Sequence, residues 1–320
     1  MSIDEERAER SEARTDDLDD ARLAAIAKDA SIGEIDWASP PAGMTAGRFS
    51  APSGSLATWA MGDPSHPRVV LVPGVTGSKE DFALLAPILV ENGYSVLSYD
   101  LAGQYESAAA GPGPSGHYDY DLFVNDLIAV LESGAPAHLL GYSFAGSVAQ
   151  LVAVRRPDLV RSLTLLTAPP LPGQTFRGVR MIGWISSLTN AHQGAGLMIW
   201  GIVTNKNKVG PTRLAFVRSR FESTSRRSVD DIIGLMRHTP DVAAELRATG
   251  IPSLVATGEH DLWPVELHAE FADRLGAELA VYRTGHSPCE TAPHQLAHDM
   301  LELFAKADGV QSDTTERDAG

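Results

Sequence analysis

One serine in the sequence has the neighbours of an activated nucleophile. Ser143 stands in the run Gly141-Tyr142-Ser143-Phe144-Ala145, between a predicted buried strand and a predicted helix. A tight turn from strand to helix projects the serine hydroxyl above the edge of a sheet, and its strain requires small residues two positions away. Gly141 and Ala145 meet this requirement. The alternative interpretation is that Ser143 only caps the helix.

A serine hydroxyl needs a base to become nucleophilic, and the base needs an acid that orients it. His286 is the candidate base because it follows the last predicted strand, and Asp261 is the candidate acid because it follows the strand before. The order Ser143, Asp261, His286 is expected when all three groups lie on loops at the carboxyl ends of strands. His260 is the nearest rival base, and a role in loop packing is favoured for it.

These residues require a sheet whose strands end at a common edge. Short β-rich runs alternate with helical periodicity, which predicts a mostly parallel sheet covered by helices. After a leading antiparallel hairpin of 47–50 and 56–61, the predicted strands are 68–72, 94–99, 137–140, 163–166, 253–257 and 279–282. The N-terminus of the helix after Ser143 offers free N–H groups, notably that of Phe144, to a developing oxyanion.

The stretch 170–248 interrupts this alternation. It has no convincing strand, and its amphipathic runs at 179–188, 214–221 and 229–238 predict a helical cap over one end of the sheet. We therefore divide the chain into five parts. They are an acidic N-terminal extension (1–44), a core domain in two parts (45–169 and 249–306), the cap between them (170–248) and a polar C-terminal tail (307–320).

Composition and charge exclude several classes of protein. The 320 residues carry a formal net charge of −15 and one cysteine, which argues against a general nucleic-acid binder and forbids an internal disulfide. The first 30 residues hold ten acids and five bases and lack an apolar stretch, so they are not a secretory signal. The longest apolar run, 197–203, is too short to span a membrane. We expect a soluble, cytoplasmic protein with solvated ends, with a short helix over 18–27 as the alternative for the N-terminal end; the oligomeric state stays open.

On these motifs the sequence resembles the α/β-hydrolase superfamily, in its serine-nucleophile, capped, esterase- or lipase-like branch. The resemblance covers about residues 45–306. Besides the serine turn and the loops at Asp261 and Gly285-His286, it includes Pro73-Gly74-Val75-Thr76-Gly77 and Asp100-Leu101-Ala102-Gly103. It implies a mostly parallel eight-stranded sheet flanked by helices, a helical cap insertion, and no cofactor or metal.

The resemblance also implies site residues. The oxyanion hole would use the N–H groups of Val75 and Phe144. Pro73 replaces the family's usual His before Gly74, so the support of this hole is expected to differ. The loop 102–107 often lies at the pocket rim in the family, where its Gln104, Tyr105 and Glu106 would tune access. The candidate pocket residues are Thr76, Tyr142, Gln104, Tyr105 and Trp263.

The implied activity is hydrolysis of an ester-like bond through an acyl-enzyme, as in a carboxylesterase for small or medium hydrophobic substrates. Thioesters, lactones and amides are also possible substrates. The same residues permit acyl transfer or hydrolysis of a C–C bond, and a non-catalytic ligand-binding protein of this fold is the alternative from another class. Ser143 as the nucleophile disfavours the family branches that use an aspartate.

Three further features of the sequence are candidates for a functional role. His294 and His298 are spaced i, i+4 as zinc ligands can be, but no third ligand accompanies them, which favours a solvent-facing helix. The segment 206–227 holds seven bases and one acid, which predicts a positive patch for an anionic substrate or, alternatively, a solvated helix face. Cys289, three residues after His286, is interpreted as a small packing residue.

Overall fold

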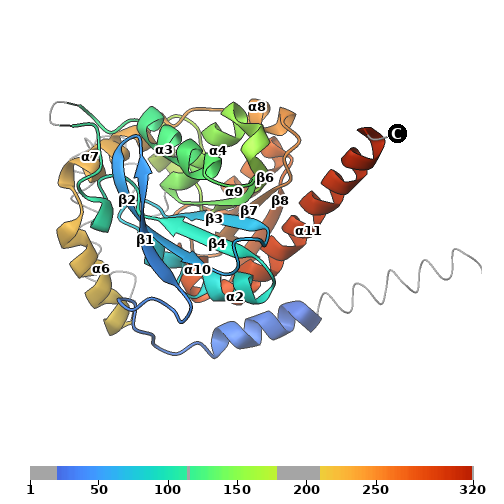
Figure 1. Cartoon of the computed structure of the whole chain (residues 1–320), viewed down its shortest axis with the longest axis horizontal. Helices are drawn as coiled ribbons and strands as arrows, with labels where there is room; N and C mark the ends of the chain where they lie inside the picture. Colours follow the sequence, from blue (N-terminus) through green and yellow to red (C-terminus); the bar gives the residue numbers. More distant parts are fainter. Residues whose placement is uncertain (1–19, 114–115, 179–209, 319–320) are drawn as a thin grey trace, which may run out of the picture.

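The computed structural model describes residues 20–113, 116–178 and 210–318, and side chains as far as residue 309. Its strands form one sheet in the order β1-β2-β4-β3-β5-β6-β7-β8 (Figure 1). They are β1 (Thr45–Ala51), β2 (Gly54–Met61), β3 (Arg68–Val72), β4 (Ser95–Tyr99), β5 (Ala137–Tyr142), β6 (Val160–Leu166), β7 (Ser253–Gly258) and β8 (Glu278–Tyr282). β2 is antiparallel to β1 and to β4, and all other neighbours are parallel. The predicted eight-stranded, mostly parallel sheet with a leading hairpin is confirmed.

From β3 onward, helices or 3₁₀ turns lie between successive strands. The α-helices are α2 (Leu85–Glu91), α3 (Tyr120–Glu132), α4 (Phe144–Arg155), α6 (Pro211–Ser223), α7 (Arg226–Leu235), α8 (Ala243–Ala248), α9 (Val265–Leu275), α10 (Pro288–Thr291) and α11 (Pro293–Asp318). The 3₁₀ turns are η1 (Lys79–Phe82), η2 (Tyr105–Ser107), η3 (Pro157–Leu159), η4 (Thr175–Gly178) and η5 (Met236–His238). Among the helices described, none combines the length and the apolar character needed to cross a membrane.

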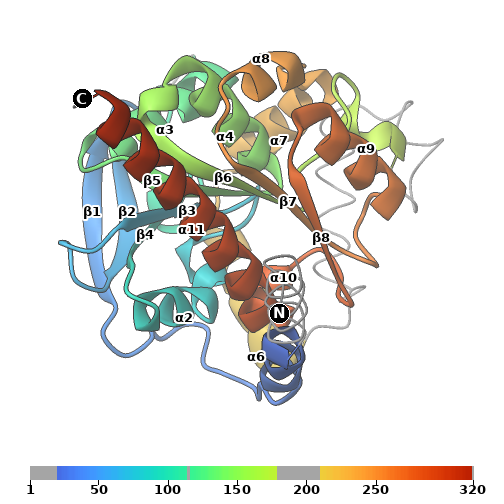
Figure 2. The same cartoon turned by 90° about the vertical axis from the view of Figure 1, so that its right-hand side faces the viewer.

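Helices cover both faces of the sheet. In the central strand β3, Val69 and Leu71 pack with α2 and α11, whereas Val70 and Val72 pack with α3 and α4. All four side chains are fully buried. Successive side chains of a strand point to opposite faces, so a strand covered on both faces is a continuous apolar run. Figure 2 shows α11 crossing one face of the sheet.

The segment between β6 and β7 contains helices where it is described. The predicted amphipathic run 214–221 lies in α6, and the run 229–238 forms α7 and η5. Val229, Ile232 and Ile233 of α7 are buried in the same hydrophobic cluster as the α4 face of the sheet. The predicted run 179–188 lies outside the described residues. Helices α6 and α7 lie together at one side of the molecule (Figure 1).

The N-terminal extension is not a solvated tail where it is described. Residues 20–30 form a helix, and the Asp29 carboxylate accepts hydrogen bonds from the backbone N–H groups of His294 and Gln295 at 2.8 and 3.1 Å. Asp29 thus caps α11, whose first N–H groups have no partner within the helix. Trp37 is buried against Arg213 of α6. The extension therefore joins the core to α6, a tertiary role that its acidic composition conceals.

The C-terminal segment, where it is described, also differs from the solvated polar tail that was predicted. α11 continues through residues 307–318, beyond the expected end of the core at 306. Ala307 is buried, Lys306 pairs with Glu278 at 2.7 Å, and Asp308 pairs with Arg161 at 2.6 Å. These contacts with β8 and β6 continue the helix past the last large apolar residue.

Candidate active site

Ser143 occupies a strained turn between β5 and α4. Its backbone has φ 53° and ψ −122°, a conformation that a non-glycine residue rarely adopts. A Cβ on Gly141 would lie only 2.6 Å from the carbonyl oxygen of Ala145, so the turn needs glycine there. The Ser143 side chain makes no capping hydrogen bond to α4. The alternative that it only caps this helix is therefore wrong.

The three predicted catalytic side chains lie together at the edge of the sheet. The Ser143 Oγ is 3.1 Å from Nε2 of His286, on the loop after β8. Nδ1 of His286 is hydrogen-bonded to Oδ1 of Asp261, which follows β7 and is buried. Thr167 donates a hydrogen bond to the backbone carbonyl of His286 at 3.0 Å and so holds this loop. The rival base His260 is exposed, and its backbone N–H donates to the backbone carbonyl of Thr284 on the adjacent loop.

The Asp261 carboxylate is held ionised by its neighbours. Burial by itself would raise its pKa, but the charge of His286 and the hydrogen bonds from His268 and His286 lower it well below the usual range. His268, on the buried side of α9, donates from Nε2 to Oδ2 of Asp261 at 2.7 Å. His268 was not among the site residues predicted from the sequence. The sequence feature that could have pointed to it is a histidine seven residues after the candidate acid, on the apolar side of an amphipathic helix.

The loop after β3 approaches the serine turn closely. A Cβ on Gly74 would lie 2.9 Å from the Cβ of Ser143, so only glycine lets the two loops meet. Val75 follows it, and Phe144 is the first residue of α4, where the N–H has no acceptor in the helix. Backbone N–H groups are the usual components of an oxyanion site, so those of Val75 and Phe144 are the candidates here.

Gln104 supports this loop from inside the protein. Its Oε1 accepts a hydrogen bond from the N–H of Thr76 at 2.8 Å, and its Nε2 donates to Ser228 of α7 at 2.6 Å. Thr76 has a positive φ of 59°, so its conformation depends on this partner. Gln104 has no exposed surface. The expectation that Gln104 lies at an open pocket rim is wrong, because its amide is used in bridging two loops and α7.

The other candidate pocket residues surround the histidine or lie further out. Tyr142 is buried with its ring centroid 5.6 Å from that of His286, and Trp263 is buried with its centroid 6.0 Å from it. Thr76 is buried in the β3 loop, whereas Tyr105 is half-buried against Phe216 of α6. A pocket of about 360 Å³ contains none of these residues; it is lined by Ala109, Ala110, Gly111, Pro112, Gly113, Tyr118, Ser225 and Arg227.

Glu106 is the third residue of the expected rim. Its carboxylate pairs at 2.6 Å with Lys79, which is buried and also pairs with Asp100 at 3.3 Å. Burial raises the pKa of Asp100 to about 7, against the lowering effect of Lys79. Glu106 is thus attached to the start of η1, directly after the β3 loop.

Two of the seven bases in the predicted positive patch point inward. Arg213 and Arg220 of α6 are buried and both donate to Asp81 of η1; Arg213 also donates to Glu290 of α10 at 3.0 Å. Despite burial, the charges of Arg220 and Arg213 hold the pKa of Asp81 below its usual value. Lys206 and Lys208 lie outside the described residues. The patch interpretation is wrong for the two buried arginines, which form an internal ion-pair cluster instead.

Cys289 is buried, and burial raises the pKa of its thiol well above the usual value. It lies in the hydrophobic cluster formed with α11. A thiol in this setting stays protonated and unreactive. The position of Cys289 fits the expected packing role.

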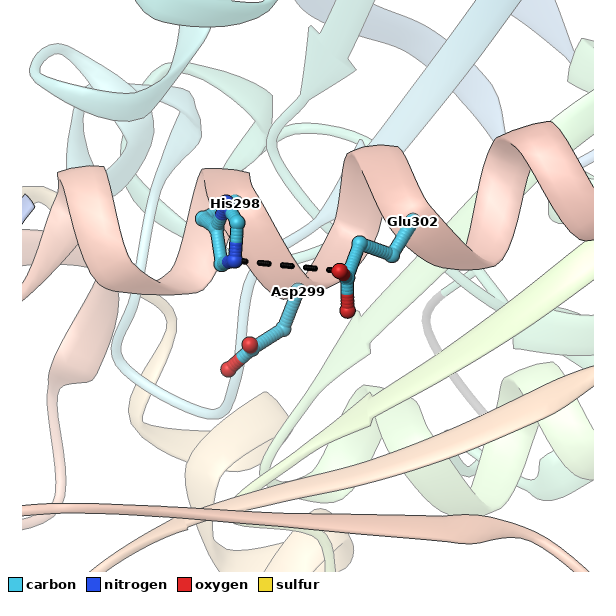
Figure 3. A group of neighbouring side chains, drawn as sticks. All are labelled: His298, Asp299 and Glu302. Carbon is cyan, nitrogen blue, oxygen red and sulfur yellow. Dashed lines mark ion pairs between the residues drawn. The ribbon is translucent and has the colours of Figure 1, made fainter. Parts of the chain in front are cut away.

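The histidines of α11 have other partners than a shared metal. His294 is hydrogen-bonded to Asp29 at 2.9 Å. His298, Asp299 and Glu302 have ligand atoms within 4.8 Å of one another, and Figure 3 shows that they come from one helix. His298 pairs with Glu302 at 3.8 Å, and Asp299 accepts a hydrogen bond from the Tyr282 hydroxyl at 2.7 Å. Each of these three side chains thus has a protein partner in the described structure.

Comparisons with known proteins identify relatives of this chain. The chain is 28% identical to the polyketide synthase ThaQ of Burkholderia thailandensis over 311 residues, which is 88% of this chain. It is 33% identical over 113 residues, 34% of the chain, to the sn-1-specific diacylglycerol lipase ABHD11 of Mus musculus. It spans only 14% and 35% of the lengths of these two relatives. The strigolactone esterase RMS3 of Pisum sativum is 25% identical over 224 residues, 65% of this chain and 81% of that protein.

A solved structure has the same fold. A thioesterase domain from the curacin biosynthetic pathway superimposes with a TM-score of 0.61 and 18% identity, over 81% of this chain and 99% of that one. The model of the alpha/beta hydrolase family matches residues 69–299, which include Ser143, Asp261 and His286. The chain therefore belongs to the alpha/beta hydrolase family.

Proposed function

We propose that this protein is a serine hydrolase that cleaves an ester-like bond through an acyl-enzyme intermediate. The observation that carries the proposal is the continuous set of hydrogen bonds from Ser143 through His286 to Asp261. A serine next to a neutral imidazole, which is in turn bound to a buried carboxylate, is an activated nucleophile.

Acylation begins when Nε2 of His286 takes the proton of the Ser143 hydroxyl. The Oγ attacks the substrate carbonyl carbon, and the carbonyl π electrons move to its oxygen. Asp261 stabilises the imidazolium that forms, since its carboxylate accepts the Nδ1–H. When the tetrahedral intermediate collapses, the bond to the leaving group breaks, and the leaving group takes the proton from Nε2. Ser143 then carries the acyl group.

Deacylation repeats these steps with water. His286 takes a proton from the water, whose oxygen attacks the acyl carbon. The bond to Oγ breaks, and Ser143 recovers its proton from Nε2. The acid product leaves, and the site returns to its first state.

The N–H groups of Val75 and Phe144 are the proposed oxyanion donors. Gln104 fixes the loop of Val75 by binding the N–H of the next residue, Thr76. It supplies the support that the family's usual histidine at the position of Pro73 would otherwise give. Loss of one such donor reduces kcat by about 10²- to 10³-fold.

We assign the helices between β6 and β7 to a cap over this site, within the segment 170–248. Of the described cap residues, Arg213 and Arg220 bind η1, and Ser228 binds Gln104. The candidate pocket residues are Thr76, Tyr142, Tyr105 and Trp263. Of these, Tyr142 and Trp263 have their rings next to the ring of His286.

Carboxylic esters of small or medium hydrophobic acids are the proposed substrate class. The names of the esterase and lipase relatives support an ester, and those of the polyketide synthase and the thioesterase domain support testing thioesters beside it. Acyl transfer and C–C bond hydrolysis use the same groups, so an acceptor alcohol and a diketone belong in the panel.

A fluorophosphonate probe tests the proposal directly. Wild type should be labelled, and Ser143→Ala should not be. The matched control is Ser147→Ala, since Ser147 is another buried serine, one turn further along α4. A p-nitrophenyl ester and acyl-thioester panel then sets the acyl length. A folded wild type that is not labelled, or a labelled Ser143→Ala variant, overturns the proposal and favours the ligand-binding alternative.

A further inference from the structure

Asp261 is bound by two histidines. Its Oδ1 is hydrogen-bonded to Nδ1 of His286, and its Oδ2 lies 2.7 Å from Nε2 of His268. The Thr257 hydroxyl adds a longer contact of 3.4 Å to the same Oδ2. Both carboxylate oxygens are therefore occupied, one by the base of the proposed triad and one by a histidine that the proposed reaction does not use.

His268 can hold only one arrangement of protons. An ionised carboxylate only accepts hydrogen bonds, so Nε2 of His268 carries the hydrogen. Its Nδ1 is buried and has no hydrogen-bond partner in the described part of the chain. A second proton there would create a buried charge with an unpaired N–H, which is costly. His268 is thus a neutral donor with a fixed tautomer.

The surroundings keep this ring in place. His268 has no exposed surface. Its ring meets that of Trp263 edge to face, with the centroids 6.3 Å apart. The ring of Trp263 also lies near that of His286. The indole N–H of Trp263 donates to the carbonyl oxygen of Thr175 at 2.9 Å. Trp263 therefore lies beside both histidines and is itself fixed.

We propose that His268 is a positioning residue of the active site, whose Nε2–H fixes the Asp261 carboxylate toward His286 and shares its negative charge. This inference rests on the proposed function. A carboxylate that accepts a second hydrogen bond cannot rotate away from His286, and it attracts the proton of the imidazolium less strongly. His286 is then both correctly oriented and free to accept the Ser143 proton near neutral pH.

The test compares His268→Leu with His268→Gln. Leucine removes the N–H donor, whereas the glutamine amide offers an N–H at the position of Nε2. The rate of fluorophosphonate labelling of Ser143 and the hydrolysis of p-nitrophenyl butyrate are followed against pH. The titratable groups that act on the Asp261 carboxylate are His286 and His268, so a change in the hydrogen bonding of this carboxylate is expected to move the acid limb of the profile.

For His268→Leu we expect the labelling rate to fall roughly 10- to 100-fold, the worth of one hydrogen bond to a charged group. The acid limb should move to higher pH by roughly one unit, because Asp261 then holds the proton on His286 more strongly. His268→Gln should restore both values. His138→Gln, which changes another fully buried histidine away from the site, should leave the limb in place.

A structural role alone would lower the rate equally at every pH without moving the acid limb. That outcome, or a His268→Leu variant with the wild-type profile, overturns the inference. Failure of wild type to react with the probe would instead overturn the proposed function.

Nitrogen-15 NMR of the wild-type imidazoles tests the inference without a variant, even if His268→Leu does not fold. We expect His268 to carry its hydrogen at Nε2 and none at Nδ1, as its contact with Asp261 and its buried, unpartnered Nδ1 require. A His268 ring with a hydrogen at Nδ1 would overturn the inference.

Discussion

Replacing Arg213 with methionine would remove a charge that holds four segments of the chain together. Arg213 projects from α6 and donates to Asp81 of η1 at 2.7 Å and to Glu290 of α10 at 3.0 Å. Its guanidinium also lies 4.3 Å from the ring centre of Trp37 in the N-terminal extension.

The expected loss follows from the burial of the two carboxylates. The side chains of Asp81 and Glu290 are 3% and 10% exposed where they pair with Arg213. Asp81 keeps Arg220 in the variant, but Glu290 loses its hydrogen-bonding cation. Breaking a buried pair by removing one partner costs about 3–5 kcal/mol. We therefore expect the free energy of unfolding at neutral pH to fall by about 4 kcal/mol.

The same loss should depend on pH. Burial raises the pKa of Glu290 above its usual value even with Arg213 beside it, and without Arg213 that pKa should rise further. The folded variant then binds a proton that the unfolded chain has released, so its deficit is largest above the folded-state pKa. As pH falls through that pKa toward the ordinary glutamate value of 4.5, the deficit should shrink.

Urea unfolding of wild type and Arg213→Met at several pH values measures both effects. Arg218→Met is the matched control, because Arg218 is exposed on the same helix; it should cost less than about 1 kcal/mol. The double variant Arg213→Met/Glu290→Met should recover most of the loss, since an apolar pair replaces a broken ionic one. An Arg213→Met variant within about 1 kcal/mol of wild type, with no pH dependence, would refute the reasoning.

Three further outcomes follow from single contacts. Gln104→Leu should reduce kcat for an ester by about tenfold or more with little change in KM, because the Thr76 N–H loses its acceptor and the oxyanion loop shifts; an unchanged kcat would contradict this. Asp29→Ala should lower the free energy of unfolding by about 1–2 kcal/mol and speed proteolysis of residues 20–44; equal stability in thermal unfolding would argue against the cap on α11. Burial lowers the pKa of His138 to about 3. The free energy of unfolding of wild type should therefore fall as pH drops below about 6.5, the pKa of histidine in the unfolded chain. Between about pH 6.5 and pH 5, His138→Phe should lose about 2 kcal/mol less than wild type, and parallel urea profiles of the two proteins would contradict this.

The three residues proposed to be catalytic could be singled out from the sequence because each depends on local sequence. Ser143 needs a strand, a tight turn and a helix in succession, and all three are encoded within a short run. Asp261 and His286 each follow a predicted strand directly. Parallel strands end at one edge, so the order of motifs along the chain was enough to bring the side chains together.

The supporting residues could not be predicted because they pair over long separations. Gln104 binds Ser228, 124 residues away, and Arg213 binds Asp81, 132 residues away. A run of bases does not reveal which of them face inward. Arg213 and Arg220 are spaced seven apart on one face of α6, but only the buried acids on η1 and α10 show that this face is internal. The N-terminal extension was likewise misread, since its acidic composition hides the contacts of Asp29 and Trp37.

The described helices between β6 and β7 contact segments that adjoin the proposed catalytic loops. α6 binds η1 through Arg213 and Arg220, and η1 directly follows the loop of the proposed oxyanion donor Val75. α6 also binds α10, which directly follows the loop of His286, and α7 binds Gln104. A displacement of these helices must therefore move the donor loop or the base loop relative to Ser143. Substitutions in α6 that weaken the buried ion pairs should on this basis lower kcat as well as substrate affinity, whereas exposed positions of the same helix should affect neither.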